Sequence, residues 1–308
     1  MGPWGLQSQI EFAEAIVQSY VSKLARPSSP SSPQSHHSTK AGEGKQQKPK
    51  IILIAHSLGT FLTLELLRRR NARLLQAQQR REWCHDSTFD ISAAILLFPT
   101  ITDIAASPSG RTIGRVAQLP YAAAVISFFA SILLKIVGIF GTAAVRGVVK
   151  AVTGMPEDAA AVTVTWLRRK GSVYQALYLA KEEMEGITED RWDDEIWSTA
   201  TSTRAMENGD RKLERNEGRT KLFFYYAQKD HWIANHTRDA LIAARGRRKK
   251  PVIIQSDEQT EVGGGDDDDD EKPVMEIDEG DVPHGFCIRK FASKRFEEQH
   301  TDMSGHRT

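Results

Sequence analysis

The sequence predicts an α/β domain built on a parallel β-sheet, because three short apolar runs alternate with helical patterns. Residues 51–54, 91–98 and 219–227 are rich in Ile, Leu, Phe and Tyr. Each run has the length of a strand, and its apolar residues follow one another as in strands that are buried on both faces. Strands of this kind, separated by helices, favour a parallel sheet over an antiparallel one.

The segments between these runs predict helices and loops. Residues 6–24 carry apolar side chains at helical spacing, and the pattern from 58 to 75 is again helical. Residues 263–271 are three glycines followed by acidic side chains, which repel one another and predict a solvated loop. The last strand is either 251–255 or 273–277, and the sequence leaves both open.

These signals divide the chain into consecutive segments. They are an early helix in residues 1–26, a disordered loop in 27–49, a strand, helix and second strand in 50–112, an apolar and helical lid region in 113–218, C-terminal strands in 219–291 with an acidic disordered loop in 256–281, and a tail in 292–308.

The composition argues against several classes of function. The 308 residues include 41 basic and 40 acidic side chains, and a formal charge of +1 argues against a general nucleic-acid binder. Cys84 and Cys287 lie far apart and predict neither a disulfide framework nor a zinc site. Neither the aspartate run nor His36-His37 has a defined ligand geometry, so we expect no metal and no organic cofactor.

Residues 55–59, Ala-His-Ser-Leu-Gly, fit the small-x-Ser-x-small pattern of a nucleophile turn. A strand that turns sharply into a helix holds its central residue in a strained conformation, and residues two positions away must be small to avoid collision. We expect Ser57 to raise its hydroxyl above the sheet edge, and the N–H of Leu58 to help bind an oxyanion. The alternative is that Ser57 only caps the helix. The apolar strand before it and the helical pattern after it favour the nucleophile.

A serine becomes a nucleophile only with a base and an acid that orients the base. In α/β-hydrolases they follow in the order Ser, acid, His. Asp230 lies three residues after Ala227, beyond the third apolar run, as the acid should; its alternative role is a turn or cap before the next helix. His284, in a Pro-His-Gly loop after the last candidate strand, lies where the base belongs. Its alternative role is that of an ordinary loop histidine.

The remaining histidines near these positions are poorer candidates for the base. His56 is expected to belong to the turn, because adjacent residues point apart. His231 is adjacent to Asp230, His236 is expected on the next helix, and His300 and His306 lie in the charged tail.

The ordered set of motifs resembles the lipid droplet-associated hydrolase family. The motifs are Leu6–Glu11, Ala-His-Ser-Leu-Gly at 55–59, Leu96–Ile101, Ser107–Gly110, Phe224–Trp232 and Pro283–Phe286. The resemblance implies a serine hydrolase of the α/β-hydrolase fold that acts on neutral lipid or sterol esters, on the cytosolic face of lipid droplets and the endoplasmic reticulum membrane. Ser57, Asp230 and His284 match the triad positions of the family.

The resemblance also implies an early loop, of Gly-Asn-Pro-Gly type, that supplies a second oxyanion N–H. One apolar strand precedes Ser57 in this sequence, and no such loop is found before it. We therefore expect an N-terminally incomplete α/β-hydrolase-like sheet, from either a truncated sequence or a degenerate relative. Losing one oxyanion donor typically lowers the rate about 10²–10³-fold.

Residues 119–145 contain a single charged residue, Lys135. A bilayer span needs about 20 such residues, but on a continuous helix Lys135, Arg146 and Lys150 would share one face. A helix lying in the interface explains these charges better than a span does. We expect contact with a lipid monolayer or membrane through about residues 119–150; the alternatives are a spanning helix and a buried lid helix.

Two functions follow from the sequence. The first is a serine ester hydrolase acting on lipid esters at a lipid surface, with Ser57, His284 and Asp230 as its triad. The alternative is a catalytically impaired surface protein of the lipid droplet that retains triad remnants and the apolar segment.

Overall fold

The sheet has four parallel strands in the order of the chain. The structure, a computed structural model, describes residues 3–24, 48–117, 119, 121–197, 219–247, 272–280 and 282–285. Its strands are β1 (Lys50–His56), β2 (Asp90–Leu97), β3 (Lys221–Tyr226) and β4 (Val274–Ile277), arranged β1-β2-β3-β4 with every pairing parallel. The predicted α/β class with a parallel sheet is therefore confirmed.

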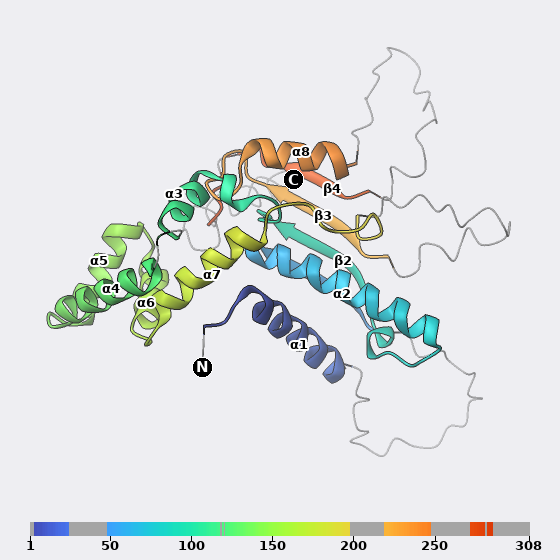
Figure 1. Cartoon of the computed structure of the whole chain (residues 1–308), viewed down its shortest axis with the longest axis horizontal. Coiled ribbons are helices and arrows are strands. Elements are labelled where there is room, and N and C mark those ends of the chain that lie inside the picture. The colour runs from blue at the N-terminus through green and yellow to red at the C-terminus, as the bar shows by residue number, and fades with distance from the viewer. Residues whose placement is uncertain are drawn as a thin grey trace, which may run out of the picture.

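Eight α-helices lie among the described residues: α1 (Leu6–Leu24), α2 (Leu58–Arg80), α3 (Pro108–Ala117), α4 (Ala122–Gly138), α5 (Thr142–Thr153), α6 (Glu157–Leu167), α7 (Ser172–Gly186) and α8 (Asn235–Arg245). Two 3-10 turns, His85–Thr88 and Ile104–Ala106, precede β2 and α3. In Figure 1 the strand arrows point toward α3, and α4, α5 and α6 lie beyond it at the far end of the molecule.

The position of the last strand, which the sequence left open, is Val274–Ile277. This strand lies inside the range 256–281 that we expected to be an acidic disordered loop, so that range is too long at its C-terminal end. The parallel register with β3, from Phe223 opposite Val274 to Tyr226 opposite Ile277, explains why these residues are extended. Residues 251–255, nearly all of 27–49 and the tail 292–308 lie outside the described residues.

Strand β1 is less buried than its apolar sequence predicts. Ile52 and Ile54 are 59% and 69% exposed, whereas an apolar run of this kind is typical of strands covered on both faces. Helix α2 packs against β1 and β2, and α1 packs on α2. Ile54, Ile95 and Phe223 lie in register across three strands on the face opposite to that core. The run of β-branched residues therefore predicted the strand correctly but its burial incorrectly.

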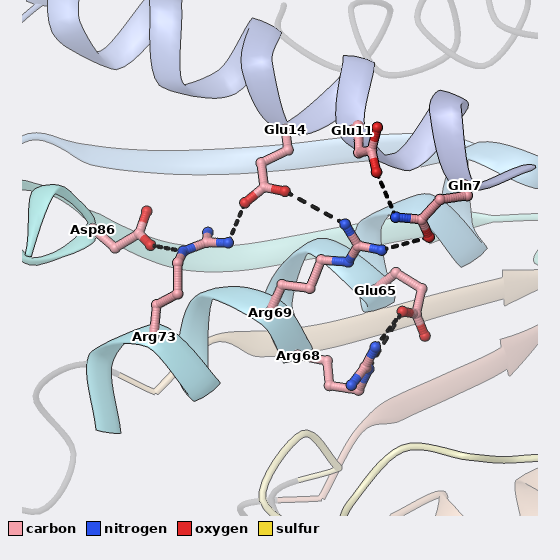
Figure 2. Close-up of polar contacts among 8 residues, drawn as sticks. All are labelled: Gln7, Glu11, Glu14, Glu65, Arg68, Arg69, Arg73 and Asp86. Atoms are coloured by element: carbon pink, nitrogen blue, oxygen red, sulfur yellow. Dashed lines mark hydrogen bonds and ion pairs between the residues drawn. The ribbon is translucent and has the colours of Figure 1, made fainter. Parts of the chain in front are cut away.

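Helix α1 is held on α2 by apolar contacts and by a set of ion pairs. Arg73 of α2 pairs with Glu14 of α1, and Arg69 donates to Gln7 at 2.8 Å, while Asp86 of the first 3-10 turn holds Arg73 from the other side at 2.5 Å (Figure 2). The ion pairs between the two helices are partly exposed, and pairs of that kind contribute about 0–1 kcal/mol each. Burial of an aliphatic side chain contributes about 1.5–3 kcal/mol, so apolar contacts are the larger stabilising contribution. The buried α1 residues are Leu6, Ile10 and Val21.

The main core lies between the sheet and these helices and includes two tryptophans that follow α7. Trp192 packs edge-on against Phe61 of α2, with ring centroids 5.6 Å apart. Trp197 stacks on Phe224 of β3 with ring centroids 5.7 Å apart, and the Arg245 guanidinium of α8 lies over the Trp197 ring, 5.6 Å from its centroid. These rings therefore connect the segment after α7 to α2 and to the sheet.

The apolar segment is not one continuous helix. Helix α4 ends at Gly138, and α5 begins at Thr142 after Gly141, whose φ of 94° is readily adopted by glycine. Arg146 and Lys150 of α5 both pair with Glu157 of α6, at 2.9 and 2.7 Å. The shared face that we expected for Lys135, Arg146 and Lys150 is therefore broken by the turn. Among the described helices, none combines the length and apolarity that a membrane crossing requires.

Candidate active site

Ser57 lies in a sharp turn between β1 and α2. Its φ of 54° and ψ of −127° are unusual for a residue with a side chain, and such strain costs about 1–3 kcal/mol. The turn is held by the Ser57 N–H, which donates to Leu97 O of β2 at 3.0 Å. A Cβ placed on Gly59 would lie 3.7 Å from that of Ala55, so the two small positions of the pattern face each other across the turn.

The side chain of Ser57 does not cap α2. It occupies the N-cap position but makes no capping hydrogen bond. Its Oγ instead lies 2.8 Å from Nε2 of His284. The structure therefore argues against the alternative that Ser57 only caps the helix.

His284 lies between Ser57 and Asp230. Its Nδ1 is 2.6 Å from Asp230 Oδ2, and the two side chains are 8% and 2% exposed. Because a carboxylate only accepts hydrogen bonds, Nδ1 carries the ring proton and donates a hydrogen bond to Asp230. Nε2 is then left with a lone pair, which accepts the Ser57 hydroxyl.

The second oxygen of Asp230 is also bonded. Oδ1 accepts the backbone N–H of Trp232 at 2.7 Å, two residues further along the same loop. With Oδ1 held by the loop and Oδ2 by His284, the carboxylate has a defined orientation. Asp230 thus makes the turn contact that the sequence left open as one alternative, and its other oxygen contacts His284, as the second alternative requires.

Parallel strands explain how residues distant in sequence meet. Ser57 follows β1, Asp230 follows β3 and His284 follows β4. Since the strands are parallel, all three lie beyond the same, C-terminal edge of the sheet, where ligands of open α/β sheets bind. Helix α3 also begins near this edge: the Ser109 N–H in its first turn donates to the backbone oxygen of His231, which follows Asp230, at 2.8 Å.

The other described histidines do not replace His284. His231 is exposed and uses its backbone carbonyl, and His236 lies exposed in the first turn of α8, as expected. His300 and His306 lie outside the described residues. His56, which we assigned only to the turn, reaches the backbone of His284: its Nε2 is 2.7 Å from His284 O.

A second anchor of the His284 loop was also missed by the sequence reasoning. Asp278, just after β4, accepts the Tyr225 hydroxyl at 2.5 Å and the Val282 N–H at 3.2 Å. The hydrogen bond to Asp278 raises the pKa of Tyr225 to about 12, with burial adding to the effect. No sequence signal marked Asp278, because the acidic residues around it were read together as a solvated loop.

The start of α2 lies beside Ser57. The first N–H groups of a helix have no partner within it, and the helix dipole favours negative charge there. The Leu58 N–H belongs to this first turn, so it is suited to bind an anion beside the Ser57 hydroxyl. Among the described residues, no group of three or more His, Cys, Asp or Glu side chains is arranged to hold a metal ion.

Comparison with known proteins gives one family. A family model described as lipid-droplet associated hydrolase matches residues 2–287. The curated lipid droplet-associated hydrolase of Gallus gallus is 26% identical over 193 residues, which are 62% of this chain and 47% of the relative. The chain thus spans about half the length of the curated relative that it matches. No solved structure matches the chain.

Proposed function

Because the chain belongs to the lipid-droplet associated hydrolase family, we propose that it is a serine ester hydrolase acting on neutral lipid or sterol esters at the lipid droplet surface. Ser57 is the nucleophile, His284 the base and Asp230 the residue that orients the base. The observation that carries the proposal is the continuous hydrogen-bonded chain from Ser57 Oγ through His284 to Asp230, at 2.8 and 2.6 Å.

The reaction follows from this geometry. Ser57 Oγ attacks the ester carbonyl while His284 Nε2 takes the hydroxyl proton, and Asp230 stabilises the imidazolium that forms. The carbonyl oxygen becomes an oxyanion, toward which the Leu58 N–H donates. His284 then gives the proton to the leaving alcohol. A water molecule, activated by the same imidazole, hydrolyses the acyl–Ser57 ester and releases the acid.

The distances support general base catalysis. A base must lie within about 2.6–3.2 Å of the group whose proton it takes, and 2.8 Å between Nε2 and Oγ meets this requirement. The backbone strain at Ser57 is typical of residues held in place for a function. A serine used only for packing or capping needs neither feature.

Labelling with a fluorophosphonate probe tests the nucleophile. We expect the folded chain to be labelled and the Ser57→Ala variant not to be labelled, because the probe reacts only with an activated serine hydroxyl. Labelling is read by in-gel fluorescence and by mass spectrometry of the peptide that contains Ser57. Ser87→Ala, in the turn before β2, is the matched control and should retain full labelling.

The outcome also separates the two functions. Soluble, folded protein that resists the probe would sink the hydrolase proposal and leave the second candidate, a lipid-surface protein with triad remnants. If the probe reacts, hydrolysis of triacylglycerol and cholesteryl ester emulsions by the wild-type chain then identifies the ester class. A location on the endoplasmic reticulum membrane, facing the cytosol, is part of the same proposal.

We further propose that α4 and the turn after it contact the lipid. None of the α4 residues is buried. Its exposed large apolar side chains, with those of the turn, are Val125, Ile126, Phe128, Phe129, Ile132, Leu133, Ile136, Ile139 and Phe140. Exposed large apolar side chains gathered on one helix and its turn are typical of interaction sites. Lys135 lies beside this face, so its ammonium can remain in the headgroup layer.

Aspartates on this face should weaken binding to lipid. The change is Phe128→Asp with Phe129→Asp, two residues that are 62% and 63% exposed and therefore tolerate a polar side chain. We expect flotation with phosphatidylcholine-coated triolein droplets to fall at least about tenfold, because burying each ring is worth about 1.5–3 kcal/mol. Trp83→Asp is the control, because Trp83 is 75% exposed and lies far from α4 in the fold. Equal flotation of both variants would rule out α4 as the lipid contact.

A further inference from the structure

The residue directly before the nucleophile contacts the loop that carries the base. His56 is the last residue of β1, and its Nε2 lies 2.7 Å from the backbone oxygen of His284. The centroids of the two imidazole rings are 5.2 Å apart, tilted by 55°. The turn at Ser57 and the loop of His284 are thus joined at a second point, besides the contact between Ser57 and His284.

The chemistry of this contact defines the state of His56. A backbone carbonyl only accepts hydrogen bonds, so Nε2 of His56 must carry a proton and donate it. A side chain with no donor at this position leaves the His284 carbonyl without this bond. The role therefore depends on where the donor atom lies and not on the aromatic character of the ring.

Phe98 packs beside both rings. Its ring centroid is 5.9 Å from that of His56 and 5.8 Å from that of His284. The side chain is 1% exposed, and the backbone has a φ of 48°, which is uncommon for a residue other than glycine. This buried ring restricts sideways movement of both imidazoles, while the hydrogen bond joins the His56 ring to the backbone of His284.

Two hydrogen bonds act on different parts of His284. The bond from Nδ1 to Asp230 orients the imidazole but does not hold the backbone of residue 284, and Asp278 anchors the loop two residues earlier, at the Val282 N–H. The bond from His56 holds the backbone carbonyl. Since His56 and Ser57 are adjacent, any anchor on His56 also fixes the base relative to the nucleophile.

We infer that His56 is a positioning residue that donates through Nε2 to the His284 backbone and so keeps the base within reach of Ser57. It does not touch substrate or take part in proton transfer. Its effect on the reaction rate rests on the proposed hydrolase function, whereas its effect on the placement of His284 does not.

Two amide variants isolate the hydrogen bond. In His56→Gln the side-chain amide nitrogen can reach the position of Nε2, whereas in His56→Asn it is one methylene short and lies near the position of Nδ1. Both variants lose the ring contacts with Phe98 and His284. A difference between them therefore reports on the donor position alone. Unfolding midpoints of both variants check that the chain still folds.

The kinetic readout is phosphonylation of Ser57, resolved into the rate constant at saturating probe, kinact, and the probe affinity, KI. A displacement of about 1 Å at a catalytic group can cost about 100-fold in rate. We expect His56→Asn to lower kinact by up to about 100-fold with KI unchanged, and His56→Gln to restore most of kinact. Equal kinact in the two variants would overturn the inference.

A proton spectrum tests the placement of His284 without any reaction. The short hydrogen bond from His284 Nδ1 to Asp230 should give a far-downfield imidazole proton, assigned by its loss in His284→Gln. We expect this resonance in the wild type and in His56→Gln, and its loss by exchange in His56→Asn. If His56→Asn retains it at full intensity, His56 does not position the base. This result is independent of whether the chain hydrolyses esters.

Discussion

Replacing His284 by alanine should lower kcat for ester hydrolysis by about 10⁶-fold, since loss of the base in such a triad costs nearly as much as loss of the whole triad. The Ser57 hydroxyl would lose the acceptor that lies 2.8 Å from it, and no side chain would then take its proton. The measurement is the steady-state rate with a soluble short-chain ester, which avoids effects of lipid binding, together with the rate of fluorophosphonate labelling.

The control for this variant is His231→Ala. His231 is exposed and lies beside Asp230 in sequence, but its backbone carbonyl makes the contact with Ser109. Its ring can therefore be removed without disturbing that bond, and activity should be retained. If His231→Ala were as inactive as His284→Ala, the base would have been wrongly assigned.

Replacing Asp230 by asparagine should lower kcat by about 10⁴-fold while leaving the fold intact. The amide that replaces Oδ2 can donate toward Nδ1 of His284, which favours the tautomer with its proton on Nε2. That tautomer cannot accept the Ser57 proton. The oxygen of asparagine can still accept the Trp232 N–H, as Asp230 Oδ1 does at 2.7 Å, so the loop should retain its shape.

Kinetics of Asp230→Asn should show a loss in kcat with little change in KM, because the acid does not touch the substrate. Asp239→Asn is the matched control, since Asp239 is an exposed carboxylate on α8 that pairs with Arg238. A rate for Asp230→Asn that remains within about tenfold of wild type would contradict the role proposed here, as the tautomer effect is far larger.

The sequence by itself determined the local parts of this protein. The apolar runs predicted β1, β2 and β3, because the strands of a parallel sheet are marked by short, nearly continuous runs of apolar residues. The small-x-Ser-x-small pattern predicted the turn at Ser57, since the two residues that would collide, two positions before and two after the serine, lie within five residues of sequence. Asp230 and His284 were chosen from chain order after a strand, and the structure brings both to Ser57. Their chemical roles stay predictions.

Only the tertiary structure decided which faces and loops meet. Whether Ile52 and Ile54 are covered depends on where helices pack, and the same apolar sequence suits an open or a closed face. The break at Gly141 depends on one glycine adopting a positive φ, which helical periodicity does not reveal.

The hydrogen bonds from His56 of β1 to His284 and from Tyr225 of β3 to Asp278 join the ends of these strands to residues after β4 that are far away in the sequence. Such contacts require the distance between donor and acceptor to be within a few tenths of an ångström of the ideal hydrogen-bond length. That precision arises only when the strands are in register and the loops beyond them converge.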